Sequence, residues 1–320
     1  MRSNSLRTLA VWGARKVLAA ILVLWGASLL GYVVLRSAPG PGPGALESLR
    51  MTPTAPGAPE PHAPGYGSWL RHALRADLGR STRIQQGRPV VHLLAAAARR
   101  SLCLAGAAML MAALSAMALA WARLTFPQVR LLRIVSGLVH LSSALPVFLL
   151  VYIAVILGNR VLSAGAEQGL WSLPPWFPFP SRDHWIPWTA AAAVLALGDG
   201  LLADMYRRFS AELERTRAND YWIGARLLGV ALHRLLFRAA LPGLAAYLSR
   251  RTAFVLGSTV VLESALGWPG LGYLAWRAAA ERDTPVLLGC ALVMALVVRV
   301  TAVAADAFRY WADPRLRGHP

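Results

Sequence analysis

Three stretches of apolar residues, at 17–35, 101–122 and 134–157, contain no Asp, Glu, Lys or Arg. A helix that crosses a bilayer needs about 20 largely apolar residues, so each stretch is long enough to span a membrane. Inside lipid the backbone must satisfy its own hydrogen bonds, which an α-helix does within one segment. These stretches therefore predict membrane-spanning helices.

Three further stretches are also long and largely apolar, but they carry charge. Residues 186–203 contain Asp199, residues 241–262 contain Arg250 and Arg251, and residues 286–305 contain Arg299. Only 15% of the whole chain is charged, against about a quarter in soluble domains. We predict an all-α, polytopic membrane protein with about six transmembrane helices, packed through Ala- and Gly-rich faces.

The basic residues indicate how the chain is oriented. The formal net charge is +18, and the arginines gather between apolar stretches, at 1–16, 123–133, 207–238 and 309–317. An excess of Lys and Arg marks short cytoplasmic loops, so we expect these segments and both termini in the cytoplasm. This distribution does not indicate a nucleic-acid partner, which would require a basic polar domain.

The region between the first two stretches forms a long external loop in this topology. Residues 39–67 are rich in Pro and Gly and predict irregular structure. Residues 69–100 have helical character, with Trp69, Leu70, Leu74 and Leu78 on one face.

The charges inside the later apolar stretches call for partners. A charge at the centre of a spanning helix costs about 2.5–3.5 kcal/mol on insertion scales. One hypothesis is that Asp199 or Asp204 pairs with Arg250 or Arg251, with Arg299 facing the same interior along a translocation path. The alternative is that these residues lie at the membrane interface, where long side chains reach water.

Several chemistries find no support in the sequence. The only lysine, Lys16, lies in Ala-Arg-Lys-Val and not in a phosphate-binding loop, and the histidines lack zinc-ligand spacing. His140 with Ser142 and Ser143 could suggest a hydrolytic pair, but polar side chains in spanning helices usually make interhelical hydrogen bonds. We expect no metal, no bound cofactor and no catalytic residue.

The segment 207–241 is basic and amphipathic. Composition leaves two readings open: the segment lies along the membrane surface, or it docks into a groove of a soluble partner. Its residues resemble the cytoplasmic coupling loop of ABC importer permeases, a motif that here comprises Asp220, Tyr221, Ala225, Arg226, Gly229, Arg234, Arg238 and Pro242.

Further segments are similar to the first permease of dipeptide and oligopeptide importers. The matches, in chain order, are 35–40 after the first span, 77–81 and 87–90 before the second, 263–272 and 282–286 in the last hairpin, and 313–315 in the tail. Their common order makes the resemblance more specific than any one of them.

The resemblance implies a type I importer permease in the bacterial inner membrane. It implies a cytoplasmic N-terminus and first span at 1–36, an external loop at 37–100, and a permease core at 101–320 with its coupling loop at about 207–242. The implied partners are a second permease subunit, two cytosolic ATPases that use the ATP, and an external solute-binding protein that delivers peptides or similar solutes. The alternative function is a stand-alone secondary transporter that uses the intramembrane Asp and Arg residues.

Overall fold

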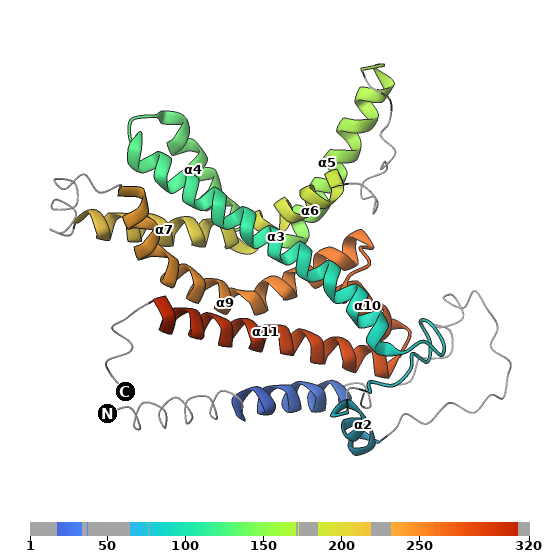
Figure 1. Cartoon of the computed structure of the whole chain (residues 1–320). Helices are drawn as coiled ribbons and strands as arrows, with labels where there is room; N and C mark the ends of the chain where they lie inside the picture. Colours follow the sequence, from blue (N-terminus) through green and yellow to red (C-terminus); the bar gives the residue numbers. More distant parts are fainter. Residues whose placement is uncertain are drawn as a thin grey trace, which may run out of the picture.

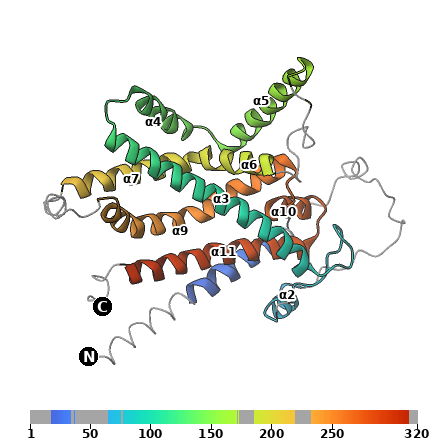
Figure 2. The same cartoon turned by 45° about the horizontal axis from the view of Figure 1, so that its top comes forward.

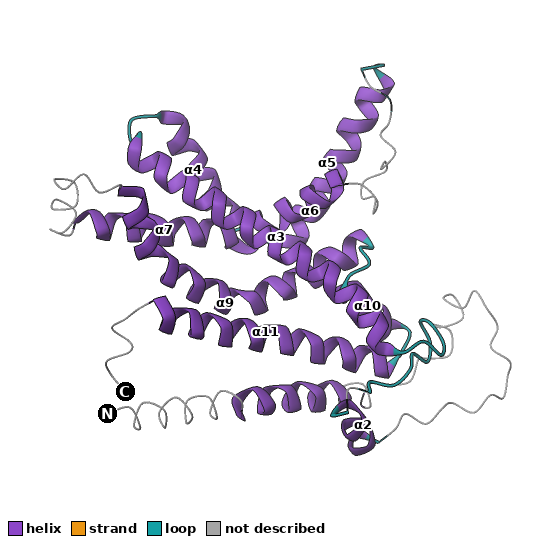
Figure 3. Ribbon diagram, viewed as in Figure 1, coloured by secondary structure: helices purple, strands orange, loops and turns teal. Residues whose placement is uncertain are grey.

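The computed structural model describes residues 18–33, 37, 65–75, 77–170, 172, 185–218 and 232–312. These residues are almost entirely helical, and within them the extended structure is a single bridge between Arg80 and Pro89. Figure 3 shows the same absence of strands in the described part of the chain. The all-α prediction is confirmed.

The described part of the chain is a succession of helices. A helix over Leu18–Val33 comes first. It is followed by α2 (Tyr66–Ala73), α3 (Val90–Thr125), α4 (Arg130–Ser142), α5 (Val147–Glu167), α6 (Trp185–Leu197), the 3-10 turn η1 (Gly198–Gly200), α7 (Leu201–Ala218), α9 (Leu232–Leu266), α10 (Leu271–Ala280) and α11 (Thr284–Ala312).

Four helical segments are long and apolar enough to cross a membrane: Val90–Thr125, Val147–Glu167, Trp188–Ala218 and Thr284–Phe308. A fifth is the pair Arg250–Leu266 and Leu271–Ala280, which bends by 68° at the break between them. The helix over Leu18–Val33 is apolar but shorter. The described residues of the six predicted apolar stretches are thus mostly helical, in the predicted order.

The third predicted span is wrong in its boundaries. Residues 134–157 do not form one helix, because α4 ends at Ser142 and α5 begins at Val147. The break follows from Pro146, which lacks an N–H group and cannot continue the hydrogen-bond ladder of the preceding turn. Only α5 is long enough to span, and it diverges from the other helices in both views (Figures 1 and 2).

The prediction of helical structure over 69–100 is also wrong for the middle of that range. The backbone leaves the helix after α2, turns through residues 77–89, and becomes helical again only at Val90. Trp69 is buried, as an apolar face requires, but Leu74 is 80% exposed. Gly79 and Gly87 have φ values of 79° and 78°, which side-chain-bearing residues rarely adopt, so these glycines place the turn.

Helix α3 is the central element and packs against α6 and α7 on one side and α11 on another (Figure 1). Its contact face is a row of alanines four residues apart, Ala108, Ala112, Ala116 and Ala120, all buried. Small residues let helix backbones approach closely where lipid removes the hydrophobic drive for association.

A second buried cluster joins the beginning of α3 to α10 and α11. It contains Val90, Leu94, Leu271 and Val286. A Cβ atom on Gly289 would lie 2.7 Å from Leu94 Cδ1, so the glycine permits the close approach of α11 to α3. This packing holds the turn 77–89 beside the start of α11.

Candidate functional site

Two helix breaks meet inside the apolar part of the bundle. One is the interval 143–146 between α4 and α5, and the other is η1 between α6 and α7. A Cβ atom on Gly198 would lie 2.9 Å from Val147 Cγ2, and one on Gly200 would lie 3.2 Å from Ser143 Cβ. The two breaks therefore interlock through glycines that leave no room for a side chain.

Asp199 occupies the centre of the second break. Its φ is 53°, a left-handed conformation that Asp tolerates better than most residues. Its carboxylate Oδ1 accepts a 3.1 Å hydrogen bond from the N–H of Val147, and its own N–H donates to the carbonyl of Leu145 at 3.3 Å. Asp199 thus caps the first turn of α5, where N–H groups lack helical partners and negative charge is favoured.

The same aspartate also connects to α9. The hydroxyl of Ser258 donates a 2.5 Å hydrogen bond to Asp199 Oδ2, and the Arg251 guanidinium donates to the Asp199 carbonyl. One residue therefore joins α5, the α6–α7 break and α9. A movement of α9 relative to α5 must strain or break these hydrogen bonds.

Asp204 lies one turn further along α7 and contacts several polar groups. Its carboxylate pairs with Arg207, accepts a 3.2 Å hydrogen bond from the Tyr247 hydroxyl, and lies 3.6 Å from the Arg251 guanidinium. Arg208 stacks over the Tyr247 ring at 4.4 Å. The side chains of Asp204 and Arg251 are 25% and 21% exposed, so this ion pair is partly shielded from solvent.

The structure distinguishes among the pairs that the sequence left open. Arg251 contacts both Asp204 and the backbone of Asp199, whereas Arg250 is exposed on α9. Arg299 is partly buried on α11, which packs against α9. Whether these side chains line a translocation path stays a prediction.

Most of the predicted coupling loop lies outside the described residues. This holds for Asp220, Tyr221, Ala225, Arg226 and Gly229. Arg234, Arg238 and Pro242 belong to the first part of α9, for which only the backbone is described. The helices that flank this segment are α7 and α9, and these same helices carry Asp204 and Arg251.

Sequence reasoning gave no role to two buried carboxylates near the other end of the bundle. Glu263 accepts hydrogen bonds from the Ser101 hydroxyl at 2.6 Å and from the N–H of Gly272 at 2.7 Å, which joins α9, α3 and α10. A Cβ atom on Gly270 would lie 2.1 Å from Glu263 Oε1, so the glycine makes room for the carboxylate.

The second is Asp283, which is fully buried just before α11. Its Oδ2 accepts hydrogen bonds from the N–H groups of Thr82, Arg83 and Ile84 at 3.1, 3.0 and 3.1 Å. Burial opposes ionisation, but the Ser81 hydroxyl and these three N–H groups outweigh it, so the pKa of Asp283 is lowered. The sequence signal that could have pointed to Asp283 was an acidic residue inside a short turn between two apolar helices.

The long apolar helices are those of an integral membrane protein. The chain belongs to the family of binding-protein-dependent transport system inner membrane components, whose model matches residues 106–318. It is therefore a multi-pass component of the inner membrane, and the members of its family work with a separate ATPase and a solute-binding protein.

Named relatives match along almost the whole chain. The oligopeptide transport system permease protein AppB of Bacillus subtilis is 26% identical over 324 residues, which cover 96% of this chain and 99% of the relative. The glutathione transport system permease protein GsiC of Shigella flexneri is 24% identical over 320 residues, with 95% and 97% covered. The permease prediction is confirmed, and the alternative of a stand-alone secondary transporter does not fit a family that depends on a binding protein.

Proposed function

We propose that this chain is one of two permease subunits of an ATP-driven importer of peptides or similar small solutes, with both termini in the cytoplasm. The observation that carries the proposal is the family match over 106–318, together with full-length relatives named for oligopeptide and glutathione transport. In this proposal ATP is hydrolysed by two partner subunits, and this chain binds no cofactor.

In the proposed mechanism, the segment 207–242 receives the movement of the ATPases, and α9 carries it into the membrane. The geometry supports this role, because α9 begins within the segment and reaches Asp199 through Ser258 and Arg251. A partner can shift the equilibrium between two conformations only if it contacts them differently. The hydrogen bonds of Asp199 are contacts of the kind that would differ between the inward-open and outward-open states.

Co-purification tests the proposal. We would tag the wild-type chain, a Gly229→Pro, Arg234→Glu double variant, and Arg133→Glu as a charge-reversal control on exposed α4. We expect the wild type and Arg133→Glu to retain a P-loop ATPase and a second permease in mild detergent, and the double variant to lose the ATPase while keeping the second permease.

Uptake assays then test the solute class. In proteoliposomes that contain the whole complex and its binding protein, we expect labelled di- to pentapeptides to accumulate only with ATP. Uptake by the isolated chain without ATP would overturn the importer proposal. ATP-dependent uptake of a sugar or a metal chelate, but of no peptide, would overturn the peptide assignment alone.

A further inference from the structure

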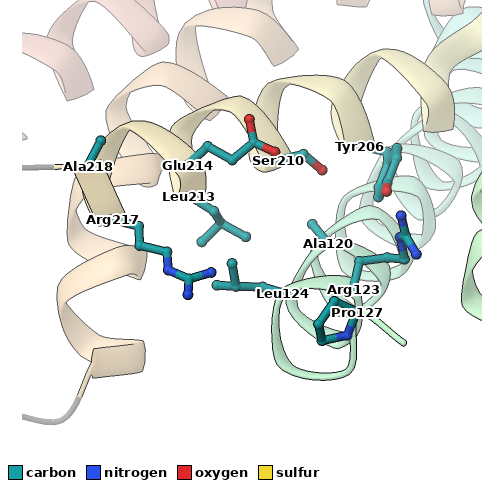
Figure 4. Close-up of a pocket in the computed structure, with 10 residues that line it drawn as sticks. All are labelled: Ala120, Arg123, Leu124, Pro127, Tyr206, Ser210, Leu213, Glu214, Arg217 and Ala218. Atoms are coloured by element: carbon teal, nitrogen blue, oxygen red, sulfur yellow. The ribbon is translucent and has the colours of Figure 1, made fainter. Parts of the chain in front are cut away.

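A pocket of about 470 Å³ opens between the end of α3 and α7 (Figure 4). This end of α3 is opposite to the one that packs against α10 (Figure 1). Arg123, Leu124 and Pro127 line it from the α3 side, and Tyr206, Leu213 and Arg217 from α7. It is separate from the Asp199 cluster and from the Asp283 turn, neither of which contributes to its lining.

Positive charge dominates the lining. Figure 4 shows the Arg123 guanidinium directed toward Tyr206 and the Arg217 guanidinium extended from the opposite side toward Leu124. The one acidic residue of the lining is Glu214, and its carboxylate points away from both guanidinium groups. An anion in the pocket would meet two cations without a competing carboxylate between them.

One of these cations has unused hydrogen-bonding capacity. Arg123 Nη1 is buried and has no hydrogen-bond partner among the described residues. A buried donor that is left unsatisfied destabilises the protein, and more so when it is charged. Arg123 lines the pocket with the rest of a partly buried side chain, so an anion bound there would lie beside this charged group.

The position and the apolar wall indicate what kind of anion fits. The apolar segment Val90–Thr125 ends at this pocket, and exposed Arg130 follows directly at the start of α4. Leu124, Leu213 and Ala120 provide apolar surface beside the guanidinium groups. Basic pockets between helices at a membrane boundary suit phosphate-bearing headgroups, because the apolar wall can hold the adjoining glycerol and acyl carbons.

We propose that the α3–α7 pocket binds a phosphate ester through the Arg123 and Arg217 guanidinium groups. Guanidinium groups bind phosphate oxygens through paired, charge-assisted hydrogen bonds. The helix ends do not contribute, because α3 and α7 both reach the pocket with their C-termini, whose partial negative charge disfavours anions. Binding therefore depends on the arginine side chains, and an anionic phospholipid headgroup is the source that the apolar wall favours.

The test measures ligand-induced shifts in thermal unfolding of the full-length chain, purified in neutral detergent. The ligands are short-chain phosphatidylglycerol, short-chain phosphatidylcholine and inorganic phosphate. The variants are Arg123→Gln and Arg217→Gln, with Arg133→Gln as a matched control that removes an exposed arginine outside the pocket.

We expect phosphatidylglycerol to raise the unfolding temperature of the wild type and of Arg133→Gln, with an affinity at least about fivefold weaker in either pocket variant. Phosphatidylcholine should act weakly, because its choline cation meets the same arginines. Without ligand, Arg123→Gln should be as stable as the wild type or more so, since it removes an unpaired buried donor. Because Arg217 is exposed, Arg217→Gln keeps the test decisive if Arg123→Gln does not fold.

The ligand arms identify the source of the phosphate. If inorganic phosphate raises the unfolding temperature as much as phosphatidylglycerol does, the pocket is assigned to soluble phosphate compounds. If phosphatidylglycerol raises it and inorganic phosphate does not, the pocket is assigned to a lipid headgroup. Unchanged phosphatidylglycerol affinity in both pocket variants, or equal stabilisation by the two lipids, would overturn the proposal.

Discussion

The hydroxyl of Ser81 donates a 2.5 Å hydrogen bond to Oδ2 of Asp283, although the two residues are 202 positions apart in the sequence. Ser81 lies in the turn before α3, and Asp283 directly precedes α11. Because the backbone N–H groups of the next three residues of the turn donate to the same oxygen, one carboxylate fastens this turn to the last spanning helix.

We predict that Asp283→Asn destabilises the protein by about 1–3 kcal/mol, because an amide cannot accept four hydrogen bonds as strongly as a carboxylate can. Thermal unfolding and limited proteolysis between α2 and α3 measure the effect. The matched control is Glu281→Gln, which breaks a partly exposed 2.5 Å ion pair with Arg277 and should cost less than about 1 kcal/mol. Equal losses in the two variants would contradict the role assigned to Asp283.

The lowered pKa of Asp283 makes this stabilisation dependent on pH. A carboxyl group with a lower pKa in the folded protein stabilises it fully above the unfolded pKa, which is about 3.9 for Asp. That stabilisation is lost as the pH falls through the lowered pKa that Asp283 has in the folded protein. We expect the difference in unfolding temperature between wild type and Asp283→Asn to stay constant from about pH 5 to 8 and to shrink below about pH 4. A difference that does not narrow in acid would show that the carboxylate charge is not responsible.

The order of the apolar helices could be read from the sequence, because a run of about 20 apolar residues is detectable without knowing any contact. The break at Pro146 could not, since spanning helices tolerate proline when neighbouring groups satisfy the freed backbone. In this protein the neighbouring group is the Asp199 carboxylate, which bonds to the N–H of Val147. That contact joins residues 52 positions apart, so no local sequence pattern predicts it.

The candidate site was predictable in part for the same reason. Asp204 and Arg251 drew attention because charge in an apolar stretch is costly and calls for a partner. The choice between Arg250 and Arg251 needed the rotation of α9, since successive residues of a helix point about 100° apart. The roles of Glu263 and Asp283 were missed because their partners are hydroxyl and N–H groups, which every sequence contains.

A double-mutant cycle tests the ion pair between α7 and α9. We predict that Asp204→Asn and Arg251→Gln, measured singly and together by unfolding in detergent, show a coupling free energy of about 0.5–2 kcal/mol, since their charges lie 3.6 Å apart. The same cycle with Arg250→Gln in place of Arg251→Gln should be additive within about 0.5 kcal/mol, because Arg250 is exposed. Equal coupling free energies in the two cycles would contradict a specific ion pair between Asp204 and Arg251.

The interlock of the two breaks predicts opposite outcomes for two Gly→Ala substitutions. In Gly198→Ala the new methyl group would lie 2.9 Å from Val147 Cγ2 and 3.2 Å from Val147 Cα. The valine side chain could rotate away, but the backbone atom could not, so we expect a loss of about 1–3 kcal/mol and weaker coupling of ATP hydrolysis to uptake. Gly106→Ala, in α3 with no atom within 4 Å of the new Cβ, should instead stabilise by about 0.5–1 kcal/mol through its higher helix propensity. Both are measured by unfolding temperature, and a stabilising Gly198→Ala would mean that the two breaks are not in contact.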